Sequence, residues 1–144
     1  MRLLVIHGPS LNLLGTREPQ IYGSKTLEDV NHDVMAAAKE HGIEVRFMQS
    51  NDEGAIIDAI HEARESADFM IINPGAYSHY SHAIADAISA SGVRAIEVHL
   101  TNIFSREPFR RRSVIAPACV GSIVGFGSFS YVLAVRAAVQ LAAA

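Results

Sequence analysis

The chain has 144 residues, of which 49% are hydrophobic and 19% are charged, and its formal net charge is −3. This length predicts one domain with a sizeable core, and the weakly negative charge argues against general nucleic-acid binding. No apolar run reaches the roughly 18 residues of a membrane span, no signal peptide is recognisable, and the lone cysteine, Cys119, cannot form an intrachain disulfide. We therefore expect a cytoplasmic protein without membrane contact. A mean hydropathy of +0.19 suggests that other subunits cover part of the surface.

Short apolar runs alternate with helical patterns along the chain. Strands are expected at residues 2–7, 43–50, 69–73, 95–99 and 120–126, and helices at residues 26–42, 55–67, 82–92 and 130–144. Thr26 can cap the first helix together with Asp29, and Gly42 suits its end. Five strands alternating with helices predict a parallel sheet covered on both faces. For this length a flavodoxin-like strand order, 2-1-3-4-5, fits best, so residues 1–144 are interpreted as one flavodoxin-like α/β domain.

The polar residues that need an explanation follow the predicted strands. They are His7–Ser10 after the first strand, Asn73–His79 after the third and His99–Asn102 after the fourth. Because ligands of such sheets bind outside the carboxyl ends of the strands, we expect a binding site there.

Several kinds of phosphate or nucleotide site are excluded by the motifs. A phosphoacceptor domain needs acidic residues after the first strand, where this chain has HGPS. A P-loop pattern is absent. The segment GFGSFS (125–130) lacks the third glycine of a dinucleotide fingerprint, so we interpret it as a tight turn before the last helix.

Metal and lysine chemistry also find little support. His7, His79 and His99 lie at the ends of adjacent strands, but no carboxylate or cysteine is spaced to complete a zinc site, so no metal is expected. The two lysines, Lys25 and Lys39, lie outside the apolar strands, where burial could have activated them for covalent catalysis.

Acid–base chemistry remains, and the segment GTREPQIYG (15–23) supports it. It places Arg17 and Tyr22 on a loop with glycine at both ends, which suits a lid of about residues 15–25 that closes over a ligand. A guanidinium close to a phenol favours the phenolate, which could remove a proton next to a carbonyl. His99 could then protonate a leaving group. The basic cluster from Arg106 to Arg112 is interpreted as a solvated loop.

The chain resembles the type II 3-dehydroquinate dehydratases over nearly its whole length. The resemblance is carried by GPSLNLLGTREPQIYG (8–23), QSNDEGAIIDAIHEA (49–63), INPGAYSHYSHAIADAI (72–88), EVHLTN (97–102) and REPFRRRS (106–113). It implies a lyase that needs no cofactor and converts 3-dehydroquinate to 3-dehydroshikimate by anti elimination of water through an enolate. Such an enzyme serves the shikimate pathway or quinate breakdown. The resemblance also implies trimers arranged into a homododecamer.

The same resemblance implies roles for individual residues. Tyr22 would be the base that takes the C2 proton, Arg17 would assist it on the same lid, and His99 would be the acid. Glu97, two residues earlier on the same strand, would orient His99.

Further positions are implied to bind the substrate: Asn73, His79, Asp86, Leu100, Thr101 and Arg110. Leu100 and Thr101 would hold its carboxylate through their backbone N–H groups. Asp86 is implied to enter from a neighbouring subunit.

Ser10 departs from the family pattern, which has asparagine at this place to hold a water against the enolate oxygen. Ser10 could support the same water, or it could cap the short turn LNLL that follows. Tyr80, His82 and Arg112 are also unusual for the family. Two hypotheses therefore stay open, an active dehydratase and a binding module on the same fold that is non-catalytic or takes an altered substrate.

Overall fold

The computed structural model describes all 144 residues, and its centre is a five-stranded parallel sheet with the order β2-β1-β3-β4-β5. This confirms the predicted fold class and strand order. The strands are β1 (Arg2–His7), β2 (Glu44–Gln49), β3 (Phe69–Asn73), β4 (Arg94–His99) and β5 (Gly121–Val124). Strand β3 is buried along its whole length, as its uninterrupted apolar run FMII predicts for the middle of a covered sheet.

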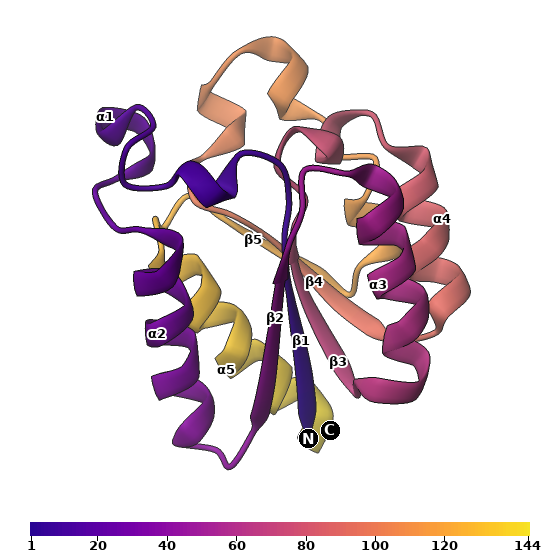
Figure 1. Cartoon of the computed structure of the whole chain (residues 1–144). Coiled ribbons are helices and arrows are strands. Elements are labelled where there is room, and N and C mark those ends of the chain that lie inside the picture. The colour runs from indigo at the N-terminus through magenta and orange to yellow at the C-terminus, as the bar shows by residue number, and fades with distance from the viewer.

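Four long helices cover the two faces of the sheet in pairs (Figure 1). They are α2 (Leu27–Lys39) and α5 (Phe129–Ala143) on one face, and α3 (Glu53–Ser66) and α4 (His82–Ser91) on the other. The sheet separates two hydrophobic clusters, because successive side chains of a strand point to opposite faces. The shorter α1 (Pro19–Tyr22) belongs to neither layer.

Local hydrogen bonds explain where the helices begin. The capping box predicted for α2 is present, since Asp29 N donates to Thr26 Oγ1 at 3.1 Å and Thr26 N donates to Asp29 Oδ2 at 3.0 Å. Helix α3 begins at Glu53, two residues before the predicted start, because Asp52 Oδ1 accepts from Gly54 N at 3.1 Å and caps it.

Strand β5 is shorter than the predicted residues 120–126. Gly125 and Gly127 both adopt positive φ angles, of 98° and 60°, which turn the chain into α5. A Cβ atom at Gly125 would lie 3.2 Å from Cβ of Asn102. The close packing of the turn against Asn102 therefore also favours a residue without a side chain. The interpretation of GFGSFS as a tight turn before the last helix is confirmed.

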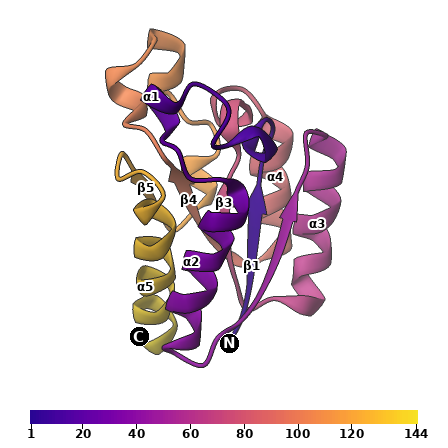
Figure 2. The same cartoon turned by 60° about the vertical axis from the view of Figure 1, so that its left-hand side comes forward.

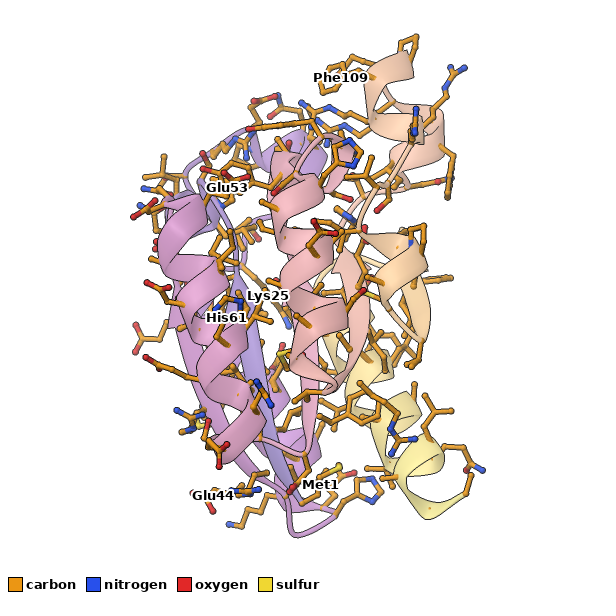
Figure 3. The ribbon with its side chains drawn as sticks, turned by 90° about the vertical axis from the view of Figure 1, so that its right-hand side faces the viewer. Met1, Lys25, Glu44, Glu53, His61 and Phe109 are labelled. Atoms are coloured by element: carbon orange, nitrogen blue, oxygen red, sulfur yellow. The ribbon has the colours of Figure 1, made fainter.

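Six short helices were not predicted. Besides α1 they are the 3₁₀ helices Leu11–Leu13, Gly75–His79, Ile103–Ser105, Pro108–Arg111 and Ala116–Ala118. Most of them follow the carboxyl ends of the strands, at the edge of the sheet opposite the two chain termini (Figure 1). Figure 3 shows the same polarity, with Phe109 at one end of the molecule and Met1 and Glu44 at the other. None of the helices combines the length and the apolar character that a membrane span requires.

Candidate active site

A cavity of about 130 Å³ opens at the carboxyl edge of the sheet, between the predicted lid (about residues 15–25), the strand ends and the loop after β4. The lid with α1 and the segment after β4 both rise above the sheet on this side (Figures 1 and 2). The cavity brings together nearly all the residues named as candidates from the sequence: Ser10, Arg17, Tyr22, Asn73, His79, His99, Leu100, Thr101 and Arg110. Glu97 lies directly behind His99, and Asp86 lies elsewhere.

Two guanidinium groups surround the Tyr22 side chain. Arg17 Cζ lies 4.5 Å from the centroid of the Tyr22 ring, and Arg106 Cζ lies 5.1 Å from it. Arg106 Nη2 also donates a hydrogen bond of 2.9 Å to the Tyr22 hydroxyl oxygen. A positive charge hydrogen-bonded to a phenol oxygen stabilises the phenolate more than the neutral phenol.

Arg106 is the functional candidate that the sequence reasoning missed. The interpretation of residues 106–112 as a solvated loop is wrong for Arg106 and Arg110, which are partly buried and line the cavity, and holds for Arg111 and Arg112, which are exposed. The segment REPFRRRS, which carries part of the family resemblance, includes Arg106 and could have pointed to it. The contact between Arg106 and Tyr22, however, joins residues 84 positions apart, which no local pattern predicts.

His99 forms a buried pair with Glu97. The His99 Nε2 atom lies 2.6 Å from Glu97 Oε2, and the side chains are 7% and 1% exposed. Since an ionised carboxylate only accepts hydrogen bonds, Nε2 carries the proton and Nδ1 is left for a ligand. Burial alone would raise the pKa of Glu97, but hydrogen bonds from His99, Ser78 and Ser113 outweigh it and hold the pKa below its ordinary value.

The wall of the cavity suits an anion. Arg17, Arg106 and Arg110 line it, and no carboxylate does. The backbone N–H groups of Leu100 and Thr101 donate to no protein atom, so two donors remain beside these cations. A small molecule that carries a carboxylate matches this charge and these donors.

Asn73 and His79 are held in defined orientations. Gly75 N donates to Asn73 Oδ1 at 3.1 Å, so the amide NH₂ is the donor side of this residue, and it also lies close to the Tyr131 hydroxyl. The His79 Nδ1 atom lies 2.8 Å from the Arg112 carbonyl oxygen, which can only accept, so Nδ1 donates and Nε2 remains an acceptor. Burial lowers the pKa of His79, which favours this neutral form.

Ser10 lines the cavity in a left-handed conformation, with φ 68° and ψ −1°. It stands at the start of the 3₁₀ helix Leu11–Leu13, but its side chain makes no capping hydrogen bond. The prediction that the Ser10 side chain caps this turn is therefore wrong, and its hydroxyl is free to face the cavity.

Two further sequence candidates lie apart from the cavity. Asp86 is exposed on α4. His7 is fully buried, and both ring nitrogens are engaged, with Tyr131 Oη at 2.9 Å and Asn31 Oδ1 at 2.7 Å. No three His, Cys, Asp or Glu side chains are grouped to hold a metal ion.

Comparison with known proteins agrees with this geometry. The family model described as Dehydroquinase class II matches residues 1–139. The 3-dehydroquinate dehydratase of Pelotomaculum thermopropionicum is 54% identical over 142 residues, which cover 99% of both chains. That of Caldicellulosiruptor bescii is 58% identical over 137 residues, which cover 94% of both chains.

Comparison with solved structures points to the same family. The crystal structure of type II dehydroquinase from Butyrivibrio crossotus matches with a TM-score of 0.93 and 48% sequence identity, and the match covers 95% of this chain and 96% of that one. A match of this extent in both sequence and fold identifies the family. The chain belongs to the class II dehydroquinases.

Proposed function

We propose that the protein eliminates water from 3-dehydroquinate to give 3-dehydroshikimate, without a cofactor. Tyr22 as phenolate removes the C2 proton, which leaves an enolate. His99, protonated on the nitrogen that faces the cavity, gives its proton to the departing hydroxyl, and Glu97 stabilises the imidazolium. Tyr22 gains one proton and His99 loses one, so the reaction leaves the total number of protons on the enzyme unchanged. The enzyme returns to its starting state when Tyr22 releases a proton to water and His99 takes one up.

One observation carries this proposal. Tyr22 is the only tyrosine that lines the cavity, its oxygen accepts a hydrogen bond from Arg106, and His99, backed by Glu97, lines the same cavity. A base stabilised as an anion and an acid stabilised as a cation are the two groups that an elimination of water needs.

The other groups of the cavity bind the substrate in this proposal. The free N–H groups of Leu100 and Thr101 and the Arg110 guanidinium hold its carboxylate, and Asn73 and His79 bond its hydroxyl groups. Ser10 holds the water that faces the enolate oxygen, as a shorter substitute for an amide.

We also propose that the active form is a homo-oligomer in the cytoplasm, a dodecamer built from trimers, in which Asp86 reaches the cavity of a neighbouring subunit. The support is a set of large aromatic side chains exposed in the loops after β4 and β5, with Phe104 at 57%, Phe109 at 58% and Phe126 at 61%. Phe109 stands at the outer end of the molecule (Figure 3). Exposed apolar groups of this size are typical of surfaces that another subunit covers.

The proposal is tested by replacing the base. In Tyr22→Phe the ring and its packing remain, so the variant should bind the substrate but lose at least about 10²–10⁴-fold in turnover. Turnover is followed by the absorbance of the conjugated enone in the product, and binding by calorimetry.

Tyr80→Phe is the matched control, because Tyr80 is 60% exposed and lies outside the cavity. Near-normal turnover of Tyr22→Phe would rule out Tyr22 as the base. A wild-type protein that binds 3-dehydroquinate but never turns it over would favour the binding module instead.

A further inference from the structure

Glu97 receives hydrogen bonds from more than His99. Ser78 Oγ lies 2.7 Å from Glu97 Oε2, and Ser113 Oγ lies 2.7 Å from Glu97 Oε1. Ser78 is fully buried and Glu97 is 1% exposed, so no water replaces these donors. The two serines come from different loops, one after β3 and the other after β4.

The directions of these bonds follow from counting protons. Each hydroxyl has one proton, and Ser113 Oγ already accepts from Ala116 N at 2.9 Å and from Ile115 N at 3.2 Å. The proton of Ser113 therefore goes to Glu97 Oε1. If Ser78 donated to Ser113 instead of Glu97, an oxygen lone pair would face the carboxylate at 2.7 Å, so Ser78 donates to Oε2.

Both serines are close in sequence to residues that line the cavity. Ser78 precedes His79, and Ser113 follows Arg110 by three residues. The loops are also joined to each other, since Val114 N donates to the Ser78 carbonyl at 2.8 Å and the Arg112 carbonyl accepts from His79. One carboxylate thus connects the His79 loop, the Arg110 loop and His99.

We propose that Ser78 and Ser113 are positioning residues for the dehydration. By donating to the two oxygens of Glu97 they keep it an ionised acceptor for His99, and they fix the loops of His79 and Arg110 relative to the acid. This inference rests on the proposed function for its kinetic consequences, whereas the hydrogen bonds to Glu97 can be tested without substrate.

The kinetic test compares Ser78→Ala and Ser113→Ala with the wild type. Loss of one donor to a buried carboxylate should lower kcat about 10- to 100-fold and move the acidic limb of the pH profile of kcat to higher pH. Ser113→Ala should also raise KM, because it releases the loop that carries Arg110. Ser78→Ala should change KM less.

Matched variants separate this role from ordinary packing. Ser113→Thr keeps the hydroxyl and should recover most of kcat and the wild-type pH profile. Ser78→Cys keeps the volume but has a weak donor, so it should fold and still show the shifted profile. Ser91→Ala removes a buried hydroxyl that bonds Ile88 O and Val93 N at the far end of α4, and it should leave both kinetic constants unchanged.

The pKa of Glu97 can be measured directly and without substrate. Infrared titration of protein with ¹³C-labelled glutamate follows the carboxylate band that disappears in Glu97→Gln. In each serine-to-alanine variant the pKa of Glu97 should rise, because a hydrogen bond that lowers it is lost. The other titratable groups near Glu97 are His99 on β4, His79 after β3 and Cys119 before β5. Burial raises the pKa of Cys119 to about 12, so this thiol stays neutral throughout.

The pKa of Glu97 and the pH profiles of the two alanine variants decide whether the serines are positioning residues. A rise in the pKa of Glu97 in both alanine variants supports the inference even if the wild type does not turn over 3-dehydroquinate, which would contradict only the proposed function. An unchanged Glu97 band with a lowered melting temperature would overturn the inference and leave the serines with a packing role. Unshifted pH profiles in an active enzyme would overturn it as well.

Discussion

At the residue scale, the two arginines beside Tyr22 contact different parts of its side chain. Arg17 lies over the ring face, where attraction between cation and ring is worth about 0.5–2 kcal/mol. Arg106 contacts the oxygen, where a hydrogen bond to a charged group is worth about 1.5–3 kcal/mol. The larger electrostatic contribution to a phenolate is therefore expected from Arg106, although Arg17 is nearer in sequence.

Replacing Arg106 tests this assignment. Arg106→Ala should lower kcat by roughly 10- to 100-fold, because the phenolate loses its donor. Arg106→Lys should recover only part of the loss, since an ammonium cannot hold Tyr22 and Thr101 with one rigid fork.

Arg111→Ala serves as the control for Arg106. It removes an equal charge from the same basic cluster, but Arg111 is exposed and outside the cavity. If the two alanine variants behave alike, the effect of Arg106 is one of general charge and not of contact with Tyr22.

At the scale of elements, the predicted lid is a short segment with a glycine turn at each end and one strained residue inside it. Gly15 and Gly23 adopt φ angles of 91° and 87°, and Glu18 has a φ of 38°, which is uncommon for a residue with a side chain. No residue of α1 is buried, so little packing supports this conformation. Small changes in backbone energy should therefore shift the lid without affecting the core.

Gly23→Ala tests the lid on its own. A Cβ atom at Gly23 meets nothing within 4 Å, so the substitution causes no clash and acts through the backbone angles, φ 87° and ψ 176°, which only glycine adopts readily, at about 1–3 kcal/mol. We expect kcat/KM to fall by roughly 5- to 150-fold while the melting temperature changes little.

Gly42→Ala gives the opposite expectation and is the matched control. Gly42 also has a positive φ, of 65°, and open space around it, but it follows α2 by three residues, and the chain leaves α2 at the end of the sheet opposite the predicted lid (Figure 1). The Gly42→Ala substitution should lower the melting temperature and leave kcat and KM unchanged. A kinetic effect of Gly42→Ala as large as that of Gly23→Ala would show that the lid is not separable from the core.

At the scale of the whole molecule, the stability of the fold should depend on His7. Burial lowers the pKa of His7 to about 4, and a hydrogen bond with Asn31 offsets this only in part. An unfolded chain has an ordinary histidine, with a pKa of about 6.5, so it takes up a proton that the folded chain refuses. The stability that neutral His7 contributes is present above pH 6.5 and is lost as the pH falls towards 4.

We expect the free energy of unfolding to decrease by roughly 2 kcal/mol between pH 7 and pH 5 from His7 alone. Urea unfolding at both pH values, at one protein concentration, measures it. The His7→Gln variant should be less stable than the wild type at pH 7, but its free energy of unfolding should decrease less between pH 7 and pH 5. An equal loss in both proteins would assign the acid sensitivity to other groups, such as His79, whose pKa is also lowered.

Assembly is the second property of the whole molecule, and Asp86 tests it. Asp86→Ala should reduce turnover although Asp86 does not reach the cavity of its own chain, because the proposed oligomer places it in a neighbour's cavity. Asp58→Ala, which removes an exposed acid from α3, should have no effect.

Mixing subunits makes the assembly test decisive. Tyr22→Phe and Asp86→Ala subunits, unfolded together and refolded, should regain part of the wild-type activity, since some cavities then combine an intact Tyr22 with an intact Asp86 from the neighbour. Absence of any recovery, in mixtures shown by size to be oligomeric, would contradict action across subunits.

The sequence by itself determined the framework of this protein. Apolar runs, helical spacing and capping residues such as Thr26 and Asp29 act over a few positions, so they predicted the strands, the helices and the edge of the sheet where ligands bind. The loop at residues 15–23 and the end of the fourth strand suggested Tyr22, Arg17 and His99 for acid–base chemistry, and the family resemblance gave them specific roles. The structure brings all three to one cavity.

Only the tertiary structure decided which groups touch. Arg106 contacts Tyr22 across 84 positions, Ser113 contacts Glu97 across 16, and the left-handed conformation of Ser10 is uncommon for serine. Such contacts depend on how loops from separate strands pack at the sheet edge, and no local pattern records that packing. The sequence therefore located the site, whereas the surroundings of its base and its acid required the folded chain.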